Sequence, residues 1–224
     1  QVNFADVHAT GAADEDFPRS GVLSVFYDAV ECPWGYDPAD SCALTVLFHE
    51  DAAALQRRAL PQKLRMLGAD WQFSPVACEL HACSTPLPME TAQWDSLNIE
   101  LTDAQSDTFA DWWLDDPGNA ASNDGEDACC HRVGGWPTPV QGNMQVECAL
   151  VAAGHYCGSG NAYSNPQLQS VRDTATDWVL LLQMGSDDKA GISWGDSGQL
   201  YLWIRRDDLR ARRFDNAWMV LQCY

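Results

Sequence analysis

Basic residues are missing from one long stretch of this sequence, because no lysine or arginine occurs between Met66 and His131. In the whole chain, 13 lysines and arginines stand against 32 aspartates and glutamates, which gives a formal net charge of −19. Such a charge opposes binding to phosphate backbones and to anionic lipid surfaces. We therefore expect neither nucleic acid nor a membrane surface as a partner.

The basic residues that are present gather in two short segments. Nine of the 13 fall within residues 57–65 and 205–213. If these segments lie apart from the acidic stretch in the folded protein, the surface is dipolar.

Long apolar runs are also missing. No stretch approaches the roughly 18 residues of a membrane-spanning helix, and no signal peptide is present. The chain begins with Gln1 instead of methionine, which is typical of a fragment or a processed product, so the missing leader excludes little. A cytoplasmic location is the default expectation.

The nine cysteines do not form a regular pattern. An odd number with irregular spacing is a poor disulfide framework for a chain of 224 residues, so we expect free thiols. The residues that could supply zinc ligands are Cys78, His81, Cys83, Cys129, Cys130 and His131. Their spacing matches no known zinc motif, and we assign no metal and no cofactor.

Catalytic motifs are absent as well. The chain has no nucleophile elbow, phosphate-binding loop or metalloprotease helix. His155 and Cys157 are two residues apart, and a thiol nucleophile needs a nearby base, but the flanking glycines equally indicate a turn. We assign no catalytic residue and favour a protein that is not an enzyme.

Patterns of apolar residues predict a mixture of strands and helices. The expected strands are residues 20–29, 43–50, 70–77, 94–102, 177–184, 198–206 and 217–224. Helices are expected at 51–60, at 142–154 and after Thr102, where Gln105 completes a capping box. A helical turn is expected before the last strand, and the segment 116–127 reads as an exposed loop.

An internal similarity relates the two ends of the chain. A strand that contains Gln1 is followed after an Asp-rich loop by a strand that begins at Gly21, and Gln183 and Gly198 repeat this arrangement. This predicts two half-repeats, at about 1–115 and 128–224, that share one core. Coincidence between two hairpins is the alternative. We expect a single α+β domain with a duplicated, β-rich, mostly antiparallel core and a few short helices.

Several motifs of the second half resemble the YwqG-like family, a bacterial domain of unknown function. They are the Gly134-Gly135-Trp136-Pro137 segment with Gln141, and the LLLQ, WGD-x-G and QC elements. The sequence LSVFYDA with PWGYDPAD extends the likeness to the first half, so it covers nearly the whole chain. The resemblance implies an α+β fold and brings no established activity, substrate or cofactor.

Two further expectations follow from this resemblance. Family members usually open with a Gly-Gly-x-Pro segment that this chain lacks, so we expect a truncated product, and the alternative is that another chain supplies the segment. Some relatives occur near bacterial toxin systems, which makes an immunity role plausible by association alone.

A row of aspartates occurs at every fourth position in the helix expected after Thr102: Asp103, Asp107, Asp111 and Asp115. Like charges at this spacing destabilise a helix by about 0.2 to 0.5 kcal/mol per pair. A face kept at such a cost suits electrostatic attraction of a basic partner. The alternative is an ordinary solvated helix face.

A second candidate site is a pocket between the two halves. Its residues would be Trp136, Gln141, Gln183, Trp194, Asp196 and Trp218. Aromatic walls with few polar groups are typical of ligand pockets. The same residues can instead be structural, with the glutamines bonded to buried backbone groups and Asp196 in a turn.

These observations favour a non-enzymatic protein-binding module of the immunity type, in which the acidic residues 103–127 dock a basic protein. The alternative is a small-molecule-binding protein or a hydrolytic enzyme with a pocket between the halves. The sequence leaves the oligomeric state open.

Overall fold

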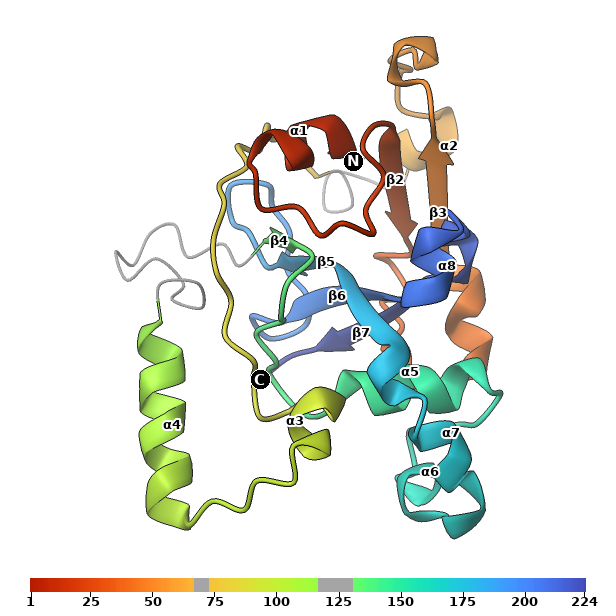
Figure 1. The fold of residues 1–224 in the computed structure, drawn as a ribbon. Coiled ribbons are helices and arrows are strands. Elements are labelled where there is room, and N and C mark those ends of the chain that lie inside the picture. Colours follow the sequence, from red (N-terminus) through yellow and green to blue (C-terminus); the bar gives the residue numbers. More distant parts are fainter. Residues whose placement is uncertain (67–72, 117–130) are drawn as a thin grey trace.

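Two antiparallel sheets form the framework of the protein (Figure 1). The computed structural model describes residues 1–66, 73–116 and 131–224. The N-terminal sheet has the strand order β1 (Val2–Asn3), β2 (Val22–Tyr27) and β3 (Leu44–His49). The C-terminal sheet has the order β4 (Arg132–Val133), β5 (Trp178–Gly185), β6 (Gln199–Arg205) and β7 (Trp218–Gln222).

The main core lies where the two sheets face each other. Strand side chains alternate between the two faces of a sheet, so Leu23 and Val46 of the N-terminal sheet point inward together. They share one buried cluster with Leu200, Leu202 and other apolar residues of the C-terminal sheet. A core built from both ends of the chain makes this a single α+β domain, as the sequence predicts.

The outer face of the C-terminal sheet is covered by a helix. Helix α5 (Met144–Ala152) begins at Asn143, whose side chain accepts hydrogen bonds from the first turn. Its buried residue Cys148 packs into a second apolar cluster with Tyr201 and Trp203 of β6. The other helices are α1 (Phe4–Ala9), α2 (Gln62–Arg65), α3 (Ala92–Ser96), α4 (Asp103–Asp115), α6 (Asn161–Ser164), α7 (Gln169–Arg172) and α8 (Arg206–Arg210).

Short 3-10 turns link these elements, at Pro38–Ala43, Ala52–Ala54, Pro166–Leu168, Ala175–Asp177 and Phe214–Asn216. One of the connecting loops, at residues 33–37, lies along the free side of β7. The Leu221 N–H donates to the Trp34 carbonyl at 3.0 Å, and Trp218 Nε1 donates to the Gly35 carbonyl at 2.8 Å. The loop therefore ties the first half of the chain to the last strand.

The two sheets have the same strand register. In the N-terminal sheet, Val22 lies between Asn3 of β1 and His49 of β3. In the C-terminal sheet, Gln199 lies in the same way between Gly185 of β5 and Gln222 of β7. The two connections differ, since only the first contains a helix, but the same backbone hydrogen bond closes both: Phe4 N–H donates to the Gly21 carbonyl at 2.9 Å and Ser186 N–H to the Gly198 carbonyl at 3.1 Å. We propose that the chain arose by duplication, and the half-repeat boundaries stay a prediction.

Five of the expected strands and the two capped helices are present, but two predictions are wrong. The helix expected at 51–60 is reduced to the turn at Ala52–Ala54, because every residue of 51–60 is exposed and a short helix without packing is marginal in water. The strand expected at 94–102 is replaced by α3, because Thr91 accepts a hydrogen bond from Trp94 N–H and caps a helix there. Here the local capping hydrogen bond decides for a helix, although the alternation of apolar and polar residues predicts a strand.

The strand expected at 70–77 is not found in its described part. Residues 70–72 lie outside the described residues, and residues 73–77 form no strand. The loop expected at 116–127 also lies outside them, apart from Asp116. In the described part of the chain, no helix is both long and apolar enough to cross a membrane.

Candidate functional site

Helix α4 carries the aspartate row, and it lies to one side of the sheets (Figure 1). It begins at Thr102, whose hydroxyl accepts a hydrogen bond from Gln105 N–H while the Gln105 side chain accepts one from Thr102 N–H. The predicted capping box is therefore present. None of the 13 residues of α4 is buried. Packing against the core does not explain why this helix forms, so local interactions such as the capping box contribute to its stability.

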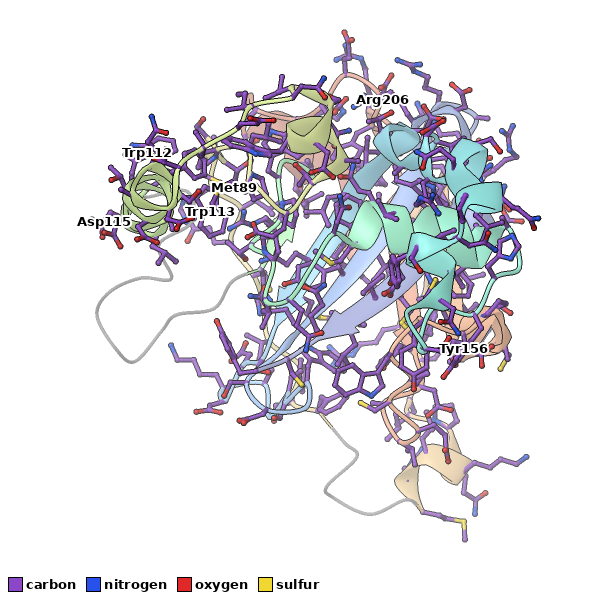
Figure 2. The ribbon with its side chains drawn as sticks, turned by 90° about the horizontal axis from the view of Figure 1, so that it is seen from below. Met89, Trp112, Trp113, Asp115, Tyr156 and Arg206 are labelled. Carbon is purple, nitrogen blue, oxygen red and sulfur yellow. The ribbon has the colours of Figure 1, made fainter. Side chains whose placement is uncertain are left out.

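Aromatic contacts hold α4 to the element before it. The ring of Phe109 lies 4.8 Å from that of Trp94 in α3 and 5.4 Å from that of Trp112, measured between centroids. Figure 2 looks along the helix and shows Trp113 on the side that faces Met89, with Asp115 on the far side. The helix thus has one face toward the body of the protein and one toward solvent.

All four aspartates of the row are exposed. In the described part of the chain, none of them forms an ion pair with a lysine or arginine. Their negative charge is therefore not neutralised by the described residues.

Two large apolar side chains are exposed on the same helix. Trp112 is 52% exposed and Leu114 is 63% exposed. With 3.6 residues per turn, Leu114 falls within the arc that the four aspartates occupy and Trp112 borders it. Exposed aromatic and aliphatic side chains ringed by charge are typical of protein interfaces, where a large apolar residue is desolvated at the centre.

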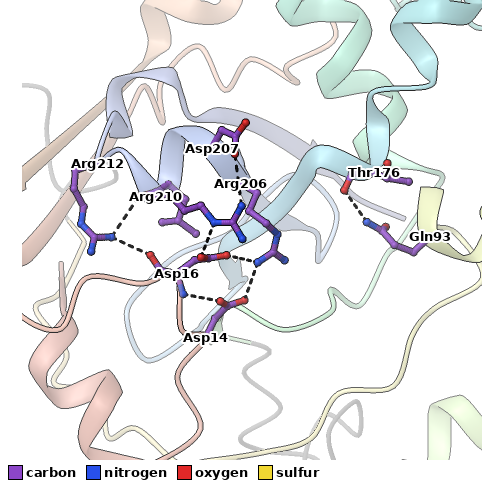
Figure 3. Close-up of polar contacts among 9 residues, drawn as sticks. Asp14, Asp16, Gln93, Thr176, Arg206, Asp207, Arg210 and Arg212 are labelled. Atoms are coloured by element: carbon purple, nitrogen blue, oxygen red, sulfur yellow. Dashed lines mark hydrogen bonds and ion pairs between the residues drawn. The ribbon is translucent and has the colours of Figure 1, made fainter.

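Arginines of the basic segment 205–213 already form ion pairs with aspartates outside α4 (Figure 3). Part of the positive charge of this segment is therefore neutralised within the protein. Arg206 and Arg210 both form ion pairs with Asp16, with Arg210 Nε 2.7 Å from Asp16 Oδ1. Arg212 donates to the Asp16 carbonyl at 2.9 Å. The hydrogen bond from Arg210, with that from Arg206, holds the pKa of Asp16 below its usual value against the effect of burial.

The basic residues of 57–65 are different, since Arg57, Arg58 and Lys63 are exposed and form no ion pair within the described residues. The dipolar surface stays a prediction.

The two glutamines of the second candidate site both join the segment 138–142 to another part of the second half, Gln183 in β5 and Cys223 just after β7. Gln183 is fully buried, accepts a hydrogen bond from Thr138 N–H at 2.9 Å and donates to Thr138 Oγ1 at 2.6 Å. Gln141 Nε2 donates to the Cys223 carbonyl at 2.8 Å. These bonds lie within the second half of the chain and hold the segment after Trp136 against the C-terminal sheet.

The other residues of that site differ in burial and in hydrogen bonding. Trp136 is half-buried and its N–H donates to Thr85 Oγ1 at 2.9 Å. Trp194 is buried in the main core, 5.5 Å from the ring of Tyr27. Asp196 is exposed in a turn. Of the six residues, Trp218 alone lines the pocket described next, and a shared site for the others stays a prediction.

Trp218 lines a small pocket whose other lining residues the sequence did not reveal. The pocket has a volume of about 120 Å³ and both halves of the chain contribute to it. Its lining consists of Asp40, Ser41, Leu44, Val46, Asp215, Asn216, Ala217, Trp218 and Met219. No spacing in the sequence relates residues 40–46 to 215–219, because β3 and the turn Phe214–Asn216 meet only in the tertiary structure.

The pair His155 and Cys157 lacks the geometry of a nucleophile and its base. Cys157 is buried, and its thiol donates to the His155 backbone carbonyl at 3.6 Å, not to the imidazole. Burial, with the nearby Glu147, raises the pKa of Cys157 to about 11. The protonated thiol is a poor nucleophile at neutral pH. Burial also raises the pKa of Glu147, which accepts a hydrogen bond from Tyr163 at 2.6 Å.

The possible metal ligands do not converge in the described residues. No group of three histidine, cysteine or acidic side chains there could hold an ion, and Cys129 and Cys130 lie outside the described residues. Asp187 accepts backbone N–H groups from Lys189 and Ala190, as a turn residue does. The described cysteines are all free thiols.

A sequence profile for a domain of unknown function matches residues 1–223 of the chain. The match spans both sheets and every helix described above. No curated protein matches the chain.

Proposed function

The chain belongs to this family, DUF1963, which includes the YwqG-like proteins, and because the family has no assigned activity we propose its role from the site. We propose a non-enzymatic protein-binding module that docks a basic partner on the outer face of α4. In its most specific form, the partner is a cationic toxin and this protein is its immunity-type inhibitor.

One observation supports this proposal above the others. Leu114 is exposed within the arc of the α4 aspartates, close to Asp111 and Asp115, Trp112 is exposed next to that arc, and α4 has no buried residue. The aspartates alone would suit a solvated helix face, and the two large apolar side chains beside them add surface that a partner could cover. The acidic residues would attract a basic partner over a distance, while Trp112 and Leu114 would be desolvated in the bound complex.

If electrostatic attraction drives docking, the association rate depends strongly on the salt concentration and on the charge of α4. The partner is captured from the native host at low salt with the immobilised chain, eluted with a salt gradient and identified. Association of the purified partner is then timed with the wild type and with Asp107→Lys combined with Asp111→Lys. We expect the double variant to slow association by about tenfold or more, and salt to slow the wild type.

A matched variant separates local charge from net charge. Glu50→Lys combined with Asp188→Lys makes the same change in net charge at two exposed sites outside α4. It should leave association nearly unchanged. Equal rates for both double variants would sink the proposal, as would unchanged dissociation in Trp112→Ala.

The pocket that contains Trp218 supports a second candidate function, the binding of a small molecule. Asp40 and Asp215 give it two carboxylates beside an aromatic ring, which suits a small organic cation. Titration with a set of small amines, followed by Trp218-dependent fluorescence, tests this alternative. Trp218→Phe should abolish the signal change but leave α4-dependent binding intact.

A further inference from the structure

The residues that follow β3 form a projecting arm. Every residue of the segment 51–66, here called the basic arm, is exposed. The arm extends beyond the end of β3, and Figures 1 and 2 both show it well apart from α4. Since all its side chains are exposed, no described segment of the chain buries the arm.

The basic arm carries positive charge in a protein that is strongly acidic. It contains Arg57, Arg58, Lys63 and Arg65 against one acidic residue, Asp51, whereas the whole chain has a formal net charge of −19. Arg57, Arg58 and Lys63 pair with no carboxylate of the described residues. The described part of the protein therefore leaves these three positive charges to solvent or to a partner.

Large apolar side chains are exposed among these charges. Leu60 is 42% exposed, Leu64 is 45% exposed and Met66 is 79% exposed. A segment of this composition suits a surface that is both acidic and partly apolar, because apolar contact then adds to electrostatic attraction.

The outer side of α4 has the complementary composition. The helix contains four aspartates and no basic residue. Trp112 and Leu114 are exposed beside the aspartates, and the segment that leads into α4 adds Leu97 and Ile99, which are 52% and 48% exposed. The arm and the α4 region thus have opposite charges, and both expose apolar side chains that contact with a partner would cover.

The two surfaces also match in length. Because an α-helix rises 1.5 Å per residue, the row from Asp103 to Asp115 extends over about 18 Å. Residues 55–61 of the arm form no helix or strand. An extended chain covers about 3.3 to 3.6 Å per residue, so Arg57 and Lys63 lie at most about 20 to 22 Å apart. One arm is therefore long enough to place positive charges beside more than one aspartate of the row.

We propose that the basic arm of one molecule docks on the outer face of α4 of a second copy. Because the arm and α4 lie apart within one molecule, the contact joins different copies head to tail. This inference rests on the proposed function, in which α4 docks basic polypeptide. It names the protein's own arm as an occupant that a foreign basic partner has to displace.

The net charge of two copies opposes the contact at long range. At about 0.15 M salt, exposed charges farther apart than about 8 Å are largely screened, whereas charges in direct contact are screened less. The measurement is therefore made at this ionic strength, on the full chain. A reductant is present because Cys42, Cys78 and Cys83 are exposed free thiols that would otherwise link molecules.

Analytical ultracentrifugation up to about 1 mM protein measures the association, since a single contact of this size is expected to be weak. We expect the average mass of the wild type to rise with concentration. Asp107→Lys combined with Asp111→Lys should weaken association by about tenfold or more, because like charges then face each other. Arg57→Glu combined with Arg58→Glu should do the same from the other side of the contact.

The effect of net charge is separated by its sign. The lysine variant makes the protein less negative, which reduces the general repulsion between copies, yet we expect it to associate less. Asp6→Lys combined with Asp188→Lys makes the same change in net charge at two exposed positions outside α4 and the arm. This control should associate at least as strongly as the wild type.

A mixture of the two charge-reversed variants tests whether the two surfaces meet. The unchanged arm of the lysine variant can bind the unchanged α4 of the glutamate variant, and their reversed surfaces again carry opposite charges. Each variant alone should be largely monomeric, whereas the equimolar mixture should associate about as strongly as the wild type. A contact between two α4 helices or between two arms would not show this recovery.

Three results would overturn the inference: a wild type that stays monomeric up to about 1 mM, association that either reversed variant leaves unchanged, or no recovery in the mixture. The proposed function is judged separately. Capture of a basic host protein by a chain that stays monomeric would retain that function and remove this inference. Self-association through the arm and α4 without any captured protein would support this inference and count against a foreign partner.

Discussion

Gln183 and Thr138 are joined by two hydrogen bonds across 45 positions of sequence, one to the backbone N–H of Thr138 and one to its hydroxyl. Gln183 lies in β5, an inner strand of the C-terminal sheet, and Thr138 lies in the loop that follows the paired glycines. Tyr201 adds a third bond, with its hydroxyl donating to the Thr138 carbonyl at 2.6 Å. The loop is thus fastened to the sheet by side chains, with no strand pairing.

Replacing Gln183 should therefore destabilise the whole domain. Gln183→Met keeps the volume but removes the acceptor of the Thr138 N–H and one donor to the Thr138 hydroxyl, so we expect a loss of about 1 to 3 kcal/mol in the free energy of unfolding. Gln141→Met is the control and should cost less than about 1 kcal/mol, because the Gln141 side chain is exposed. Urea denaturation followed by tryptophan fluorescence and by circular dichroism measures both. Equal midpoints would contradict the prediction.

Gly35 should tolerate no side chain. Its φ is +90°, and a Cβ at this position would clash with the backbone carbonyl of Met219. Gly35→Ala should displace the 33–37 loop from β7 and lower the melting temperature by several degrees, about 2 to 4 °C for each kcal/mol in a chain of this size. Gly11→Ala has a similar φ of +78° but open space around it. It reports the strain of the backbone alone, so the difference between the two variants measures the clash.

The aromatic contact of α4 should control local stability and leave global stability alone. Phe109→Ala removes the ring that contacts Trp94, so amides of α4 should exchange faster while the amides of β5 and β6 keep their rates. Trp112→Ala removes an exposed ring and should change the free energy of unfolding by no more than about 0.5 kcal/mol. Faster exchange in β6 after Phe109→Ala would show that α4 is part of the main cooperative unit.

The ion pairs of Asp16 predict a loss of stability in acid. Because its pKa is lowered in the folded protein, Asp16 contributes stability that is present above its unfolded pKa of about 3.9. This contribution is lost as the pH falls through the lower folded value. Asp16→Asn should therefore reduce stability at pH 7 and flatten its fall below about pH 4. Asp6→Asn, an exposed change in α1, is the control in the same denaturation series.

Parts of the candidate site were accessible from the pattern of residues. The capping box at Thr102 and the four-residue spacing of the aspartates predict helix α4 and its acidic face, since both depend on neighbours within one or two turns. A helical wheel of the sequence would also have shown that Leu114 lies on the same face of the helix as the aspartates. Its exposure could not have been predicted, because a sequence does not say which face of a helix is packed.

The sequence by itself determined the α+β class, five of the seven strands, the capped helices and the family. These features depend on composition, alternation and contacts between near neighbours, which act before any tertiary contact forms. Only the tertiary structure decided that residues 51–60 stay exposed without a helix, that Trp194 is core while Trp218 lines a pocket, and that Phe26 is exposed while Trp203 is buried. Each of these outcomes depends on which distant segment packs against the residue, and no local pattern encodes that.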